Sequence, residues 1–537
     1  VTAGVLRGER SRFQLFGDSM NTASRMESTG VRNRIQISQE TADLLLSAGK
    51  GGWLVPRDDT VVPKGKGEMQ TYWLEVGAHD GTSVTSGESS DEESVAEIEY
   101  QAKNPNVAET QNAALAAKAL RLIDWNVDLL IRLLQIIVVQ RQAHPTRGAP
   151  PDERLEHPDG HTVLDEFSEI VVLPEFDLKN EVGDSKSVVL DPKVELQLYE
   201  YVTAVASMYR KNPFHNVEHA SHVTMSVAKL LSRIVAPSNM DFKDSEAKDQ
   251  TLHDHTYGIT SDPITQFACV LSALIHDVDH TGVPNTQLVN ENHNIASYYK
   301  GRSVAEQNSV DVAWDLLMQE EFAALRATIY STDEELKRFR QLVVNCVMAT
   351  DIMDKDLKAL RNARWDRAFS ESAVVDKDPR VAVNRKATIV IEHLIQASDV
   401  AHTMQHWHIY RKWNAKLFEE MYKAYKEGRS EKNPAEFWYK GEIGFFDFYI
   451  IPLAKKLKEC GVFGVSSKEY LNYAERNRKE WESRGQEVVS ELIENMKKIY
   501  DTPPAERESS ISQDPPSVDG VIRIPTDITI ESTSLIT

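Results

Sequence analysis

Residues Leu271–Gly282 have the sequence LSALIHDVDHTG, in which a largely apolar run ends at a histidine and an aspartate. Such a run predicts a buried helix. A buried pair that can carry charge, here His276 and Asp277, requires a polar partner. His280 follows one turn later, and we expect it on the same side of the helix as His276. The stretch therefore predicts a polar centre at the end of a core helix.

Two further segments carry matching polar residues. PFHNVEHASH separates His215 and His219 by four positions, which places both imidazoles on one face of a helix. LIQASDVAH ends a third apolar stretch with Asp399. The HDH motif His253–His255 lies in a polar segment and predicts a solvated loop. Two histidines and two aspartates predict an N2O2 metal site, in which one bridging aspartate can hold a second, harder ion. The predicted ligands are His219, His276, Asp277 and Asp399.

The length of 537 residues exceeds what one core usually serves, so we expect two folded regions. Residues 1–76 mix strand-like and helix-like stretches and predict part of an α+β domain. Residues 77–107 include the acidic, serine-rich run TSVTSGESSDEES and predict a linker. Residues 108–142 predict a helical connector, residues 155–500 an all-α domain, and residues 501–537 a disordered tail. The fold class is therefore mainly α.

The connector contains no Pro or Gly and has helical periodicity. Its apolar stripe either packs on its own domain or pairs two copies of the chain as a homodimer. Its most apolar run is interrupted by Asp124, Asp128 and Arg132, which are costly in lipid. We therefore expect no membrane segment in this chain.

The overall charge excludes a nucleic-acid binder, because 61 basic residues stand against 82 acidic ones, for a net charge of -21. Cys269, Cys346 and Cys460 lie far apart in apolar or helical contexts and predict reduced core thiols. We expect a cytoplasmic domain. The first residue, Val1, is not a start methionine, so we also expect upstream sequence, which leaves a membrane anchor there open.

The order of the H, HD and D motifs resembles the HD superfamily, and specifically the class I cyclic-nucleotide phosphodiesterases. The resemblance extends from LDEFSEIVVLPEF, Leu164–Phe176, to about Tyr500, and includes MATDIMD and KLFEEMY. It implies an all-helical domain that hydrolyses 3',5'-cyclic nucleotides, cAMP or cGMP, to 5'-nucleotides. It also implies a zinc site and a looser magnesium or manganese site bridged by Asp277, which together activate a hydroxide.

The same resemblance assigns roles to further residues. His215 is implied as the general acid and Glu420 as the carboxylate that orients it. His280 and Glu306 match residues that hold waters on the metals, although the AEQNS sequence around Glu306 departs from the family pattern. Asn216 is implied in substrate binding.

The implied base pocket contains the main departure from the family. Phe445, Leu417 and Met421 match the positions that sandwich the purine, but Glu442 stands where the family has a glutamine. A carboxamide offers a donor and an acceptor, whereas an ionised carboxylate only accepts. We expect an enzyme that accepts both nucleotides or tolerates cGMP. The alternative is that burial keeps Glu442 protonated, so that it imitates the amide.

The N-terminal segments FQLFGDSMNTASRMEST and VPKGKGEMQTYWL resemble the C-terminal part of a class III nucleotide cyclase domain. The resemblance places Gln14 at the base-reading position, Asn21 and Arg25 near the ribose and phosphate, and Lys64 or Lys66 near the polyphosphate. The metal-binding aspartates of that family precede this region, so we do not expect this chain to make cyclic nucleotide. We expect the intact protein to join a cyclase to a phosphodiesterase.

A second function class is consistent with the altered base pocket. The chain would then be a regulatory module that binds cyclic nucleotide without turning it over. Tight binding of metal and nucleotide with slow hydrolysis would distinguish this module from the enzyme.

Overall fold

The computed structural model describes residues 2–6, 12–16, 26, 29–31, 34–47, 53–57, 70–74, 105–143, 148–153, 160–175, 188–234, 245–369 and 378–500. The chain divides into two compact units, Val1–Glu97 and Ile98–Thr537. The predicted linker, residues 77–107, lies outside the described residues except for its last three, which belong to a helix. The predicted tail, residues 501–537, lies outside them entirely.

The first unit is built from short antiparallel pairings. Strands β1 (Thr2–Leu6) and β2 (Arg12–Phe16) form one pair. A second sheet has the order β3-β5-β4, with β3 at Ile35–Ser38, β4 at Leu54–Pro56 and β5 at Thr71–Leu74, and helix α2 at Gln39–Ser47. Trp73 of β5 is buried, and the guanidinium groups of Arg34 and Arg57 lie 4.4 and 4.7 Å from its ring centroid. The buried hydrophobic residues described in this α+β unit are Met26, Ala42 and Trp73.

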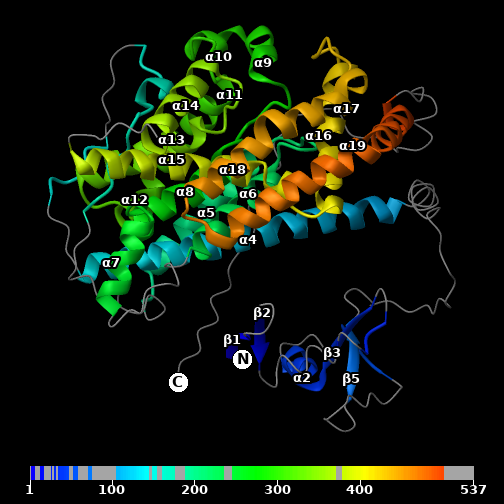
Figure 1. Ribbon diagram of the computed structural model, residues 1–537, viewed down its shortest axis with the longest axis horizontal. Coiled ribbons are helices and arrows are strands. Elements are labelled where there is room, and N and C mark those ends of the chain that lie inside the picture. Colours follow the sequence, from blue (N-terminus) through cyan, green and yellow to red (C-terminus); the bar gives the residue numbers. More distant parts are fainter. Residues whose placement is uncertain are drawn as a thin grey trace. The chain divides into compact units, whose positions relative to one another are not determined.

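The second unit begins with the long helix α4 (Pro105–Ala143). Its side chains are described from residue 117, and they bury an apolar stripe that includes Ile123, Leu130, Leu134 and Ile137. The helix packs against α5 (Pro192–Met208), α6 (Val217–Ser232) and α8 (Pro263–Ile275) (Figure 1). The described part of the connector therefore packs on its own domain, the first of the two alternatives.

All other described elements of this unit are helices. The remaining elements are η2 (Val163–Glu166), α7 (Ser245–His255), η4 (Ile259–Ser261), α9 (Asn285–Glu291), α10 (His293–Tyr298), α11 (Val304–Leu317), η5 (Glu320–Phe322), α12 (Ala323–Ile329), α13 (Asp333–Met348), α14 (Lys355–Phe369), α15 (Pro379–Asp399), η6 (Ala401–Met404), α16 (Trp407–Lys426), α17 (Pro434–Phe445), η7 (Phe446–Ile450), α18 (Ile451–Glu459) and α19 (Gly464–Tyr500). Helix α8, buried at nearly every position, lies at the centre and packs against α4, α6 and α13.

Local sequence signals account for several helix starts. Asp191, Asp378 and Asn433 each cap a helix whose first residue is proline, and each side chain accepts a hydrogen bond from a backbone N–H of the first turn. One prediction was wrong: His253–His255 ends helix α7 and is not a loop. The helix is stabilised at its end by His253, whose Nδ1 lies 3.0 Å from Ser261 Oγ.

The three cysteines are buried and form no disulfide. In the part of the chain that the structure describes, no helix is both long enough and apolar enough to cross a bilayer.

Candidate metal centre and adjoining pocket

Three helices bring the four predicted metal ligands together. His219 lies in the first turn of α6, and Asp399 is the last residue of α15. Helix α8 ends at Ile275, so His276 and Asp277 follow directly at its C-terminal end. Because α6, α8 and α15 pack against one another in the core, their polar ends meet at one point.

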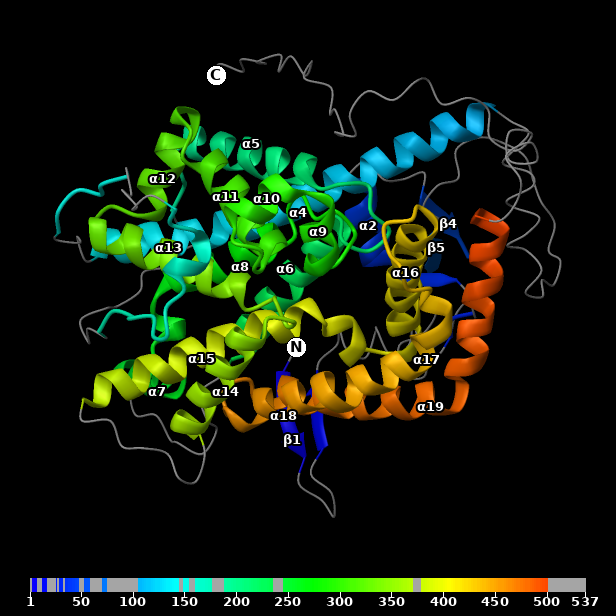
Figure 2. The same cartoon turned by 90° about the horizontal axis from the view of Figure 1, so that it is seen from above.

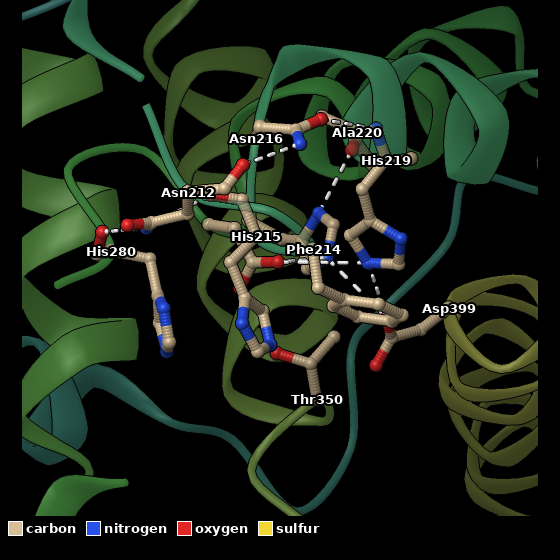
Figure 3. Close-up of polar contacts among 12 residues, drawn as sticks. Asn212, Phe214, His215, Asn216, His219, Ala220, His280, Thr350 and Asp399 are labelled. Carbon is tan, nitrogen blue, oxygen red and sulfur yellow. Dashed lines mark hydrogen bonds and ion pairs between the residues drawn. The ribbon is translucent and has the colours of Figure 1, made fainter. Parts of the chain in front are cut away.

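The donor atoms of these residues converge within a few ångströms. His219 Nε2 lies 3.1 Å from Asp399 Oδ1 and 3.6 Å from Asp277 Oδ2. His276 Nε2 lies 3.1 Å from Asp277 Oδ2 and 3.5 Å from Asp399 Oδ1. Figure 3 shows His219 beside Asp399. Two imidazole nitrogens and two carboxylates thus face a common centre.

The chemistry of this donor set fits a divalent metal ion. His276 Nδ1 lies 2.9 Å from Ala273 O, so Nδ1 carries a proton and Nε2 is the nitrogen that faces the two carboxylates and that could bind a metal. That Nε2 is buried and has no hydrogen-bond partner, because its contact with Asp277 lacks hydrogen-bond geometry. Burial raises the pKa of Asp277 and of Asp399, but the neighbouring imidazoles outweigh burial and hold both pKa values well below the ordinary range. Two ionised carboxylates and two imidazoles suit zinc or a similar ion.

His215 and Glu420 form a second polar pair beside this centre. Glu420 Oε1 contacts His215 Nδ1, and Glu420 Oε2 accepts hydrogen bonds from the backbone N–H groups of Phe214 and His215, at 2.8 and 2.9 Å. Burial lowers the pKa of His215, but the charge and hydrogen bond of Glu420 outweigh it and raise the pKa to about 9. The imidazole is therefore protonated at neutral pH.

The turn that carries His215 corrects the expected helical spacing. Helix α6 begins at Val217, so His215 precedes it and does not share a helix face with His219. Asn216 is the N-cap, and its side chain accepts hydrogen bonds from the backbone N–H groups of Glu218 and His219. Asn216, which we predicted to bind substrate, thus orients the start of the helix that carries His219.

His280 also lies outside the expected helix. Asp279 has a φ of 63°, in the left-handed region, and this turn ends the helical path that would have aligned His280 with His276. The His280 ring instead packs 3.9 Å from the His215 ring, centroid to centroid (Figure 3). Burial, followed by the positive charge of His215, lowers the pKa of His280 to about 4. His280 is therefore the neutral member of the pair.

Glu306 belongs to a second group of acids. Asn285 Nδ2 donates to Glu306 Oε2 at 2.8 Å and lies 3.4 Å from Asp351 Oδ2. Burial and the charge of Asp351, with a smaller contribution from Asp277, raise the pKa of Glu306 to about 8. Such crowding of acids suits a cation nearby. The sequence pattern alone does not single out Asp351 or Asn285 as site residues, although the MATDIMD motif includes the aspartate.

Glu442 is buried in a hydrogen-bonded network between α16 and α17. Tyr410 Oη donates to Glu442 Oε2 at 2.5 Å, Asn414 Nδ2 lies 3.4 Å from Tyr410 Oη, and Trp438 Nε1 donates to Asn414 Oδ1 at 3.2 Å. Burial raises the pKa of Glu442 to about 7, against the opposing effect of the bonds from Tyr410 and Asn414. The carboxyl group is therefore partly protonated at neutral pH.

The predicted purine-contacting residues lie on the same two helices. Leu417 and Met421 of α16 and Phe445 of α17 are partly buried, and the two helices pack together. The Phe445 ring stacks on Tyr449, with centroids 5.4 Å apart and ring planes 18° apart. His402, which the sequence pattern did not single out, packs edge-on against Phe214, with the two ring centroids 5.5 Å apart. Burial lowers the pKa of His402 to about 3, so it is neutral.

The predicted cyclase residues are mostly outside the structural description. Gln14 lies in strand β2, but its side chain is not among those described. Asn21, Arg25, Lys64 and Lys66 lie outside the described residues. Their roles stay predictions.

Comparison with protein-family models gives two matches. Residues 214–464 match the 3'5'-cyclic nucleotide phosphodiesterase family, and residues 1–76 match the adenylate and guanylate cyclase catalytic domain. The first range contains every residue that we placed at the metal centre, in the acid pair and in the base pocket.

Curated relatives support the first match. A probable 3',5'-cyclic-AMP phosphodiesterase of Caenorhabditis elegans is 27% identical over 300 residues, which cover 53% of this chain and 40% of the relative. A dual specificity calcium/calmodulin-dependent 3',5'-cyclic nucleotide phosphodiesterase 1C of Mus musculus is 26% identical over 270 residues, covering 48% of this chain and 32% of the relative. The chain thus spans less than half the length of these relatives.

Among solved structures, the phosphodiesterase domain of a RhoPDE fusion protein from the choanoflagellate Salpingoeca rosetta is similar to this chain. The two are 21% identical, with a TM-score of 0.43, over 57% of this chain and 86% of that domain.

Proposed function

We propose that this chain, whose residues 214–464 belong to the 3'5'-cyclic nucleotide phosphodiesterase family, hydrolyses 3',5'-cyclic nucleotides to 5'-nucleotides. The observation that carries the proposal is the placement of a protonated His215 beside the convergent donors of His219, His276, Asp277 and Asp399. The relatives named for cyclic AMP and for both nucleotides support this substrate class without deciding the base.

The four convergent residues would hold one divalent ion, and we propose zinc for this position because of its mixed nitrogen and oxygen donors. Asp277 would also be a ligand of a second ion, magnesium or manganese, bound on the side of the centre where Glu306 and Asp351 lie. When bound, such ions supply an acidified water nucleophile and neutralise phosphate charge.

The protein supplies the proton for the leaving group. Glu420 engages His215 at Nδ1, so Nε2 is the atom from which a proton can be transferred. A pKa of about 9 keeps that proton in place at neutral pH until the 3' oxygen of the ribose departs. His280, which is neutral and packs against the His215 ring, leaves the proton on His215.

For the base, we propose that Glu442 acts in both protonation states. Tyr410 fixes one carboxyl oxygen, so the other is the group available to a purine. The protonated form offers one donor and one acceptor in all, as an amide does, whereas the ionised form only accepts. Both adenine and guanine are therefore acceptable at neutral pH, which supports a dual-specificity enzyme.

The test is hydrolysis of cAMP and cGMP by the full chain with magnesium or manganese, beside Asp399→Ala. Turnover by the unmodified chain that Asp399→Ala abolishes is the expected result. A folded, metal-loaded chain that binds either nucleotide but turns over neither would overturn the proposal in favour of a sensing module, the second candidate that the departure at Glu442 favours.

The match of residues 1–76 to a cyclase domain supports a further part of the proposal, that the intact protein joins a cyclase to this phosphodiesterase. The test is to determine the full-length coding sequence and to assay its product for cyclase activity with GTP and ATP. A coding sequence without the remaining cyclase domain would contradict it.

A further inference from the structure

A small cationic pocket lies apart from the metal centre, between α14, α15 and α18. Figure 2 shows these three helices together along one side of the domain, and α15 packs against both of the others. The pocket has a volume of about 100 Å³. Its lining includes Lys358, Arg361 and Lys456, and none of its lining residues, all in the described part of the chain, carries a carboxylate. In a chain with a net charge of -21, this is an unusual concentration of positive charge.

Arg361 is the innermost of the three cations, with only 8% of its surface exposed. Its Nη2 donates to the backbone oxygen of Asp351 at 2.9 Å. Its Nη1 is buried and has no hydrogen-bond partner, and within the described residues the guanidinium makes no ion pair. A buried charge is costly unless an opposite charge and hydrogen-bond acceptors compensate it. Arg361 therefore lines the pocket with a charge that no described carboxylate pairs, and its guanidinium keeps one buried donor without an acceptor.

Lys456 and Lys358 add charge that is also unpaired among the described residues. Lys456 Nζ donates to Asn362 Oδ1 at 3.0 Å and lies 5.0 Å from the Trp365 ring centroid, but reaches no carboxylate. Burial lowers the pKa of Lys456. The charges of Asp366 and Glu459 partly oppose this effect, and the charge of Arg361 lowers the pKa further. The cations thus repel one another, and an anion between them would relieve that repulsion.

We propose that this pocket binds a phosphate-type oxyanion. Its volume is sufficient for a single phosphate group. Arginine donates to phosphate oxygens from a fixed fork, and the lysines supply point charges. Phe448, which is 82% exposed, lies at the rim and could pack on a ring carried by that phosphate. The ligand is therefore a free phosphate or a phosphate on a larger aromatic molecule.

Some residues that line the pocket also contact residues near the metal centre, but none of the proposed metal ligands lines the pocket. Arg361 holds the backbone of Asp351, and Tyr449, another lining residue, stacks on Phe445. The inference does not rest on the proposed hydrolysis, because the pocket would bind its anion whether or not the neighbouring site is active.

The test is thermal unfolding of the full chain in potassium phosphate and in potassium chloride of equal ionic strength. Phosphate at roughly ten times its dissociation constant should raise Tm by on the order of 2 °C beyond chloride. The shift should persist in Asp399→Ala, which separates the pocket from phosphate bound at the metal centre. It should fall to less than half in Lys456→Met.

The matched control is Lys455→Met, which removes the adjacent exposed lysine that does not line the pocket. The control should keep the full shift. Equal shifts in Lys456→Met and Lys455→Met, or no shift beyond chloride in any variant, would overturn the proposal. Phenyl phosphate distinguishes the two ligand sources: a larger shift than with inorganic phosphate indicates a phosphate carried on an aromatic group, and an equal shift indicates the free anion.

Discussion

Tyr410 donates a 2.5 Å hydrogen bond to the buried carboxyl group of Glu442. This bond orients a side chain that stands where the resembled family has a glutamine. Burial raises the pKa of that carboxyl group to about 7, so small changes in pH alter its charge. Stability and base selectivity should both depend on this residue.

Glu442→Gln should stabilise the protein, and the gain should grow as pH rises. In the unfolded chain the carboxyl group has its ordinary pKa of 4.5, whereas in the folded chain the pKa is about 7. The folded state therefore binds more protons between these values, and wild-type stability falls as pH rises through this range. The neutral amide removes this loss and can still accept from Tyr410. Thermal unfolding should show a gain of up to about 3 kcal/mol at pH 8 and much less at pH 5. A gain that does not vary with pH would contradict the raised pKa.

The same substitution should change the pH dependence of nucleotide selectivity. In the wild type, the ratio of kcat/KM for cAMP to kcat/KM for cGMP should shift between pH 6 and pH 8, because the acid form loses its donor on ionisation. In Glu442→Gln that ratio should stay constant over the same range. Selectivity that is identical in both proteins at every pH would remove Glu442 from base recognition.

Glu420→Gln should lower kcat by about 100-fold, because His215 loses the carboxylate that stabilises its proton. The raised pKa of His215 keeps the acid form present up to about pH 9, so the alkaline limb of the pH–rate profile should move to lower pH in the variant. Glu419→Gln is the matched control. Glu419 is the adjacent residue, and in the described structure His215 pairs with the carboxylate of Glu420 and not with that of Glu419. Equal losses in both variants would show a general effect on α16.

Asp277→Asn should lower both metal content and turnover by at least about 100-fold, because one of the convergent carboxylates loses its charge. Asp279→Asn, two residues away, weakens a partly exposed pair with Arg210 and a 3.3 Å hydrogen bond from Asn308, and it should retain activity. Metal analysis after dialysis and hydrolysis assays check both. Chelation of the wild type should abolish turnover, and manganese should restore it.

The ion pair of Arg364 and Glu392 lies in the core, with 1% of each side chain exposed. Glu392→Gln should destabilise the protein by about 3 kcal/mol, because it leaves a buried guanidinium without its counter-charge. Glu491→Gln breaks the exposed pair with Arg411 and should cost less than about 1 kcal/mol. Denaturant unfolding measures both. The double variant Arg364→Met/Glu392→Leu should recover part of the loss if the unpaired charge is its cause.

Much of the metal centre was predictable because its residues stand at the ends of apolar runs. His276 and Asp277 follow α8, and Asp399 ends α15, so local pattern alone indicated where polar groups enter the core. The roles of these residues still rest on the proposed function. The predictions that failed were geometric: His215 and His280 lie in turns and not on helices, because Asn216 caps α6 and Asp279 adopts a left-handed conformation.

By itself, the sequence determined the mainly helical fold and the types of residue that would meet at its centre, since apolar periodicity and residue order are local properties of the chain. Only the tertiary structure showed that Asp351 lies beside Glu306, that Tyr410 holds Glu442, and that Arg361 lines a pocket whose described residues carry no carboxylate. These relationships join positions far apart in sequence or on different helices. Their charges and pKa values depend on burial and on neighbouring groups, which exist only once the helices have packed.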